Sequence, residues 1–185
     1  MRRAQIHETD AVIAFYRKLI TENAHSPYHP DWRLDIYPTN EQIAAYVLRG
    51  EMYVLDADES DASGEYLAAF ALSDEPADGY DSVPWILPVA WSDAIVVHLL
   101  CVDCAYQRRG IGRHIVASLI NICRGMGKQA IRLDVMTKNL PAQKLYTSAG
   151  FVYVGRFEIT YEDTGTMEFF MYEYDLSEKG NAHHV

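Results

Sequence analysis

The stretch "AIVVHLLCVDCAYQRRGIG" at residues 94–112 decides how the rest of the chain is interpreted. Its first nine residues, 94–102, are almost wholly apolar, which predicts a strand buried on both faces of a sheet. A Cys-x-x-Cys pair follows at Cys101 and Cys104, and a basic glycine turn follows at residues 107–112. The cysteine pair would suit a zinc or redox site, whereas the glycine turn would suit a phosphate group.

The cysteine pair is the weaker of the two motifs. A structural zinc needs four ligands, but the remaining cysteine, Cys123, lies within a predicted helix, and the seven histidines show no ligand spacing. A redox pair usually lies at a helix N-terminus, whereas Cys101 ends a strand. We therefore expect small apolar side chains here and no metal site. Three cysteines also argue against a disulfide framework and favour a reducing cytoplasm.

The glycine turn predicts an anion site. The first amides of a helix have no partners within the helix, and the helix dipole favours a negative charge there. Gly110 and Gly112 leave room for a phosphate, and Arg108, Arg109 and Arg113 add positive charge. The turn has neither the third glycine of a dinucleotide fingerprint nor the Gly-Lys-Ser/Thr of a triphosphate loop.

The charge distribution agrees with one anion-binding segment. The net charge is −10, which disfavours nucleic acid as a partner. Residues 105–146 nevertheless carry eight basic side chains and one acid, Asp134. No apolar run reaches the roughly 18 residues that a membrane span needs. Acidic residues interrupt residues 1–16, so we expect no signal peptide there.

Periodicity and turn residues predict the order β-α-α-β-β-β-α-β-α-β-β. The expected elements are a strand at 2–7, helices at 9–23 and 39–50, strands at 51–57, 64–73 and 94–102, a helix at 111–126, a strand at 130–136, a helix at 139–150, and a strand pair at 151–160 and 167–176. Residues 74–92 contain three prolines, which predicts a long loop with a functional role. Residues 177–185 read as a flexible polar tail.

Three separated motifs resemble the GNAT superfamily of acyl-CoA-dependent N-acetyltransferases. Gln107-x-x-Gly110-x-Gly112 matches that family's pyrophosphate motif. Residues 131–155 are similar to its next segment, with Asn139 and Tyr146 seven apart and Gly-Phe after them. The resemblance implies a single α/β domain over 1–176. It also implies a mixed central sheet of about seven strands with flanking helices, splayed between the strands at 94–102 and 130–136 near a bulge at 102–103.

The resemblance also implies acetyl-CoA as cofactor and assigns residues to it. The diphosphate would be held by Gln107, Arg108, Arg109, Gly110, Ile111, Gly112 and Arg113. The pantetheine arm would run along Leu100, Cys101 and Val102, with the Leu100 amide facing the thioester carbonyl. Asn139 matches the residue that contacts the coenzyme arm. Tyr146 matches the tyrosine that protonates the leaving thiolate.

His98 is the candidate general base, and this candidate comes from the residues themselves. It is the one ionisable side chain in strand 94–102, and alternation places it on a face with Val96, Leu100 and Val102. A buried, hydrogen-bonded structural histidine is an equal alternative. Many family members place a glutamate near the start of this strand, where Val96 stands here. Asp93 and Glu158 are weaker candidates.

The amine acceptor would enter between the 24–38 loop, the 74–92 loop and the last two strands. Candidate lining residues are Tyr28, Trp32, Asp35, Trp91 and Tyr161, and local packing is the alternative for each. We expect a cytoplasmic N-acetyltransferase that works by direct transfer in a ternary complex. Its acceptor would be a small cationic amine, an amino acid or a peptide amine. A non-catalytic acyl-CoA-binding or sensor domain is the alternative, and the sequence leaves a homodimer open.

Overall fold

The computed structural model of the chain describes residues 1–57, 65–161 and 165–177. Residues 58–64, where the predicted strands at 51–57 and 64–73 are connected, lie outside these ranges, as does the tail from residue 178 onward. The described residues fall into two compact units. The first contains Met1–Leu72 and His98–Gly112, and the second contains Ser73–Val97 and the chain from Arg113 onward. Strand β4 (Ala94–Val102) contributes residues to both units.

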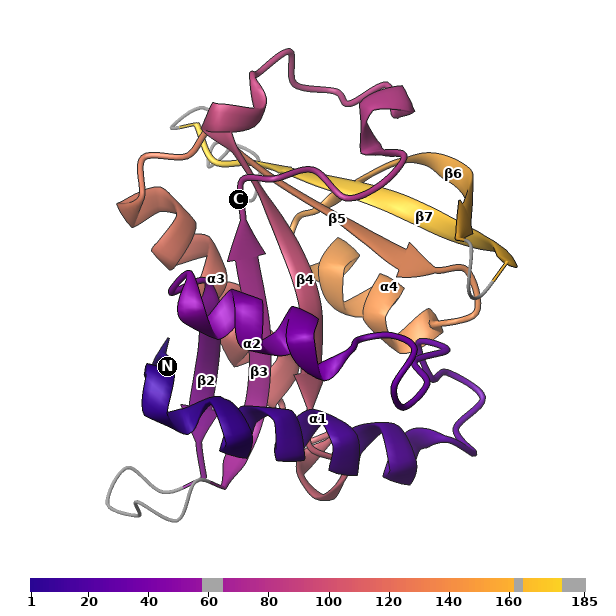
Figure 1. The fold of residues 1–185 in the computed structure, drawn as a ribbon. Coiled ribbons are helices and arrows are strands. Elements are labelled where there is room, and N and C mark those ends of the chain that lie inside the picture. The colour runs from indigo at the N-terminus through magenta and orange to yellow at the C-terminus, as the bar shows by residue number, and fades with distance from the viewer. Residues whose placement is uncertain (58–64, 162–164, 178–185) are drawn as a thin grey trace. The chain divides into compact units, whose positions relative to one another are not determined.

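In the first unit, two helices cover one face of a small antiparallel sheet (Figure 1). Its elements are β1 (Arg2–Arg3), η1 (Ile6–Glu8), α1 (Thr9–Asn23), α2 (Asn40–Leu48), β2 (Met52–Asp56), β3 (Tyr66–Ser73), the C-terminal half of β4 and η4 (Cys104–Tyr106). Helix α2 begins at Thr39, whose hydroxyl accepts from the Gln42 amide in a capping box. Tyr16 and Ile43 are fully buried between these helices and the sheet.

The second unit is built around a strand crossover. Its elements are η2 (Tyr80–Ser82), η3 (Trp91–Asp93), the N-terminal half of β4, α3 (Ile111–Gly125), β5 (Ala130–Met136), α4 (Leu140–Ser148), β6 (Val152–Tyr161) and β7 (Gly165–Asp175). The first two residues of α3 belong to the first unit. Strands β4 and β5 are parallel, β7 is antiparallel to β5, and β6 is antiparallel to β7.

The predicted fold class is confirmed. The seven strands form one mixed sheet in the order β1-β2-β3-β4-β5-β7-β6, and the elements follow the predicted order. The main difference is at the N-terminus, where the strand ends at Arg3 and a 3-10 turn follows. This turn forms because Gln5 and Glu8 make a capping box that ends the extended backbone. The bounds of a single domain at 1–176 stay a prediction.

The long segment 74–93 has no strand but is firmly attached to its own unit. Arg132 on β5 and Glu173 on β7 are 3% and 2% exposed and lie 2.9 Å apart. Arg132 donates to the Leu87 carbonyl at 3.0 Å, and Glu173 accepts from the Leu87 amide at 2.9 Å. The Arg132 guanidinium also lies over the rings of Trp85 and Trp91, at 5.0 and 4.5 Å. One buried ion pair thus fixes the backbone and two rings of this segment.

Replacing Arg132 with Met should leave Glu173 buried without its cation. The expected cost is about 3 kcal/mol of unfolding free energy, measured by urea denaturation. Amides near Leu87 should also lose protection from hydrogen exchange. Arg156→Met is the matched control, because it breaks the exposed ion pair with Glu168 and should change stability much less. Equal effects of the two substitutions would contradict this account of the segment.

Candidate active site

Strand β4 departs from regular pairing in its second half. The pairing described between β4 and β5 covers Ala94–Val96 and goes no further. Leu99 has a left-handed backbone with φ +57°, which costs a non-glycine residue roughly 1–2 kcal/mol. Its carbonyl accepts a hydrogen bond from the Tyr16 hydroxyl at 3.0 Å. An irregularity therefore lies at Leu99, three residues before the predicted bulge at 102–103, which stays a prediction.

The amides after this irregularity have a defined direction. The Asp103 amide donates to the Leu67 carbonyl of β3 at 2.9 Å. Since successive amides of an extended strand point to opposite edges, the amides of Val102 and Leu100 point away from β3. The side chain of Cys101 is buried, and its thiol lies 3.7 Å from the Ala69 carbonyl. Only its backbone can therefore line the free edge of the strand.

Side chains in and next to the glycine turn stabilise its backbone through hydrogen bonds. Asp103 caps η4 by accepting from the Ala105 amide at 2.8 Å, and the Gln107 side chain donates to the Val102 carbonyl at 3.2 Å. Arg108 and Gly110 then adopt left-handed backbones, with φ of +62° and +83°, before α3 begins. The side chain of Gln107, which was predicted to hold the diphosphate, therefore stabilises the backbone of the turn through this hydrogen bond.

The residues of this turn fit a diphosphate group. Residues 107–110 are exposed, and a Cβ added at Gly110 would meet no heavy atom within 4 Å. Open space therefore adjoins the first amides of α3. Arg108 and Arg109 are exposed beside it, and the Arg109 guanidinium lies 5.3 Å from the Tyr106 ring centroid. Free amides together with forked cationic donors form a suitable environment for phosphate oxygens.

His98 stacks on α2 and leaves one ring nitrogen unsatisfied. Its ring lies 5.6 Å from that of Tyr46 at an interplanar angle of 29°. Its Nε2 is buried and has no hydrogen-bond partner among the described residues. Burial, and to a smaller extent the positive charge of the nearby Arg49, lower the pKa of His98 to about 4. The imidazole is therefore neutral at pH 7, and it does not match a fully hydrogen-bonded structural histidine.

Two of the predicted coenzyme residues of the second unit lie on or beside α4. Tyr146 is 5% exposed and meets Phe151 edge-on, with ring centroids 5.3 Å apart. Asn139 caps the helix by accepting from the Ala142 amide at 3.2 Å. The cap alone accounts for an Asn at position 139. The roles of both residues toward a coenzyme stay predictions.

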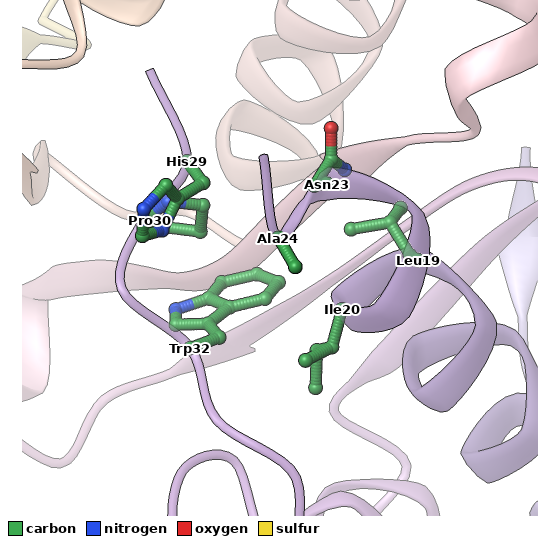
Figure 2. Close-up of a pocket in the computed structure, with 7 residues that line it drawn as sticks. All are labelled: Leu19, Ile20, Asn23, Ala24, His29, Pro30 and Trp32. Carbon is green, nitrogen blue, oxygen red and sulfur yellow. The ribbon is translucent and has the colours of Figure 1, made fainter. Parts of the chain in front are cut away.

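The predicted acceptor residues of the first unit differ in their surroundings. Trp32 lines a small pocket with Leu19, Ile20, Asn23, Ala24, His29 and Pro30 (Figure 2). Tyr28 is exposed and is not among the residues that line it. Asp35 pairs with Arg17 at 2.6 Å, and this hydrogen bond lowers the pKa of its carboxyl. Trp32 therefore has a concave surface beside it.

The two remaining acceptor candidates belong to the second unit. Trp91 packs on the Arg132 guanidinium and donates to Asp81 at 2.9 Å, so packing explains its position. Tyr161 ends β6, and its side chain lies outside what the structure describes.

A partly buried acid and its partner were not predicted from the sequence. The Tyr80 hydroxyl donates to Asp134 on β5 at 2.6 Å. Burial raises the pKa of the Asp134 carboxyl, although the hydrogen bond from Tyr80 opposes this. The signal was present, because Asp134 is the single acid in the basic segment 105–146 and stands in an apolar strand.

The cysteines are free thiols, with Cys101 and Cys123 buried. Among the described residues, no group of three His, Cys, Asp or Glu side chains could hold a metal ion. None of the helices in the described ranges combines the length and apolar character needed to cross a membrane.

Comparisons with known proteins give a consistent picture. A model described as the acetyltransferase (GNAT) family matches residues 18–151. N-alpha-acetyltransferase RimI of Mycobacterium tuberculosis is 46% identical over 59 residues, which are 32% of this chain and 35% of that protein. The match thus spans about a third of the length of that curated relative.

Solved structures extend the likeness to almost the whole chain. An acetyltransferase of the GNAT family from Streptococcus agalactiae aligns with a TM-score of 0.73 at 20% identity, over 94% of this chain and 93% of that one. The protein yncA of Salmonella typhimurium, solved with its cofactor acetyl-CoA, aligns with a TM-score of 0.66 at 17% identity, over 96% and 93%. At these identities, the likeness concerns the fold.

His98 should make the protein sensitive to acid. Its pKa is near 6.5 when unfolded and about 4 when folded, so the unfolded chain binds the proton first as the pH falls. The contribution of a neutral His98 to the unfolding free energy is complete above pH 6.5 and is lost as the pH falls toward 4. Between pH 7.5 and 5.5, the wild type should lose about 1 kcal/mol more unfolding free energy than His98→Leu. Urea denaturation at both pH values measures this difference, and parallel losses in the two proteins would contradict it.

Proposed function

This chain belongs to the acetyltransferase (GNAT) family, and on that premise we propose that it transfers an acetyl group from acetyl-CoA directly to a primary amine. The observation that carries the proposal is the turn at residues 107–112. Its left-handed Gly110, exposed arginines and position at the start of α3 supply what a diphosphate requires. When bound, acetyl-CoA supplies an acetyl group activated as a thioester.

In this proposal, the free edge of β4 orients the acetyl group. The amide of Leu100 donates to the thioester carbonyl, where negative charge develops as the amine attacks. The amide of Val102 binds the pantetheine arm, and Cys101 takes part through its backbone. A fixed donor of this kind typically stabilises a transition state by ~3 kcal/mol. The direction of the Asp103 amide, bonded to β3, supports this assignment.

The acceptor proposed is the α-amine of a peptide or protein. A lysine amine with pKa ~10.4 must lose its proton at a cost of ~4.6 kcal/mol at pH 7, whereas an α-amine with pKa near ~8 needs about 1.4 kcal/mol. His98 has a low pKa and is too weak a base to deprotonate a lysine ammonium. Once the amine has attacked, its nitrogen becomes acidic, and the unpartnered Nε2 of His98 can then accept the proton. The name of the RimI relative points to the same class of amine.

The leaving thiolate needs a proton, and we assign this step to the Tyr146 hydroxyl. A positioned general acid contributes roughly 10²–10⁴-fold to the rate. The phenol is a suitable donor because its ring is held against Phe151. We place the reaction in the cytoplasm, in keeping with the three free thiols.

The proposal is tested by following release of free CoA from acetyl-CoA. Short peptides with a free α-amine should support turnover, while the same peptides blocked at the N-terminus but carrying an internal lysine should not. Gly110→Ala should raise the KM for acetyl-CoA, because alanine disfavours the left-handed turn by roughly 1–2 kcal/mol. Binding of CoA without acetyl transfer to any amine in a broad panel would identify a binding module and contradict the proposal.

Tyr146→Phe should lower kcat by roughly 10²-fold or more and leave the KM for acetyl-CoA nearly unchanged. The defect should shrink with an acetyl thioester of a more acidic thiol, which needs no protonation to leave. Tyr153→Phe on β6 is the control, because that ring is 48% exposed and has no proposed role. An equal loss of kcat with both thioesters would assign Tyr146 to packing.

A further inference from the structure

Asp103 is a buried carboxylate at the entrance to the proposed diphosphate turn. It is 5% exposed, and it is the one buried acid that the structure describes in the first unit. It directly follows the last residue of β4 and stands four residues before Gln107. An anion at this point would repel the coenzyme, so its surroundings determine whether the turn can bind one.

Both carboxylate oxygens of Asp103, its backbone amide and its backbone carbonyl each make a hydrogen bond. Its Oδ1 accepts from the Ala105 amide at 2.8 Å, and its Oδ2 accepts from Lys18 Nζ at 2.8 Å. Its backbone amide donates to the Leu67 carbonyl, and its carbonyl accepts from the Tyr106 amide, each at 2.9 Å. The residue therefore links β3, η4 and α1 at one point.

Lys18 provides the charge that balances this carboxylate. It extends from α1, which packs against η4, and its side chain is 55% exposed while that of Asp103 is 6% exposed. The hydrogen bond to Asp103 raises the pKa of Lys18, so the ammonium is charged at neutral pH. Glu22 on the same helix is 4.0 Å away, and the charge of Glu65 also raises the pKa of Lys18.

We propose that Lys18 is a positioning residue for the coenzyme, which cancels the charge of Asp103 and ties the diphosphate turn to α1. Without Lys18, the buried carboxylate would act on a bound diphosphate through a medium of low dielectric, where repulsion is stronger than in water. This inference rests on the proposed function, since it assumes that the turn binds CoA. It differs from a direct role in which Lys18 itself contacts a phosphate.

Calorimetric titration of the full chain with CoA tests the inference. Lys18→Met should raise the Kd roughly tenfold, the range expected when a hydrogen bond to a charged group is lost. Adding Asp103→Asn removes the unbalanced charge and keeps the acceptor for Ala105, so the double variant should recover to within about threefold of the wild type. Lys18→Arg, which keeps the charge, should bind nearly as well as the wild type.

A matched control separates this local effect from net charge. Combining Lys18→Met with Glu22→Gln restores the net charge of the wild type, as Asp103→Asn does, but it leaves the Asp103 carboxylate in place. The Kd of this double variant should stay as high as that of Lys18→Met alone. Recovery in this control, or no recovery with Asp103→Asn, would overturn the inference. An unchanged Kd in a folded Lys18→Met protein, as judged by its Tm, would do the same. Failure of the wild type to bind CoA would instead remove the proposed function.

Discussion

A buried strand must satisfy its backbone amides, and in β4 the pairing described with β5 ends at Val96. Beyond that point, the chain turns through a left-handed Leu99, and the Tyr16 hydroxyl satisfies the carbonyl that this turn displaces. The amides of Leu100 and Val102 then point away from β3. A ligand with amides and a carbonyl of its own, such as the pantetheine arm of CoA, can pair with this edge as a strand would. In this proposal, the apolar residues of 94–102 bury the strand, and its interrupted pairing with β5 leaves backbone amides for the coenzyme.

The charges around β4 bear on the proton transfers of the proposed reaction. In the proposed reaction, a neutral His98 with a low pKa suits an amine that is already partly uncharged at neutral pH better than a lysine side chain. The turn is cationic and exposed, whereas the acid at its entrance, Asp103, is buried and paired with Lys18. An acidic protein can thereby present one segment suited to an anion. A net charge of −10 is therefore compatible with the proposed anionic coenzyme.

The helices, strands and glycine turn could be predicted because their signals are local. Thr39 as a cap, Gly110 in a left-handed turn and the period of α3 depend on residues within one or two turns of helix. The left-handed Leu99 could not be predicted, because leucine carries no preference for it and the hydroxyl that stabilises it is 83 positions away. The same holds for Arg132 with Glu173, 41 positions apart, which explains the place of Trp91 by packing. Side-chain partners distant in sequence account for most of what was missed.

The thiols of this chain have an experimental consequence. Burial raises the pKa of all three thiols, that of Cys123 to about 12. Because the thiolate is the form that attacks disulfides, all three are slow nucleophiles at neutral pH. A chromogenic disulfide reagent added to the folded protein will therefore react first with any coenzyme thiol set free in solution, which leaves a low background from the polypeptide itself.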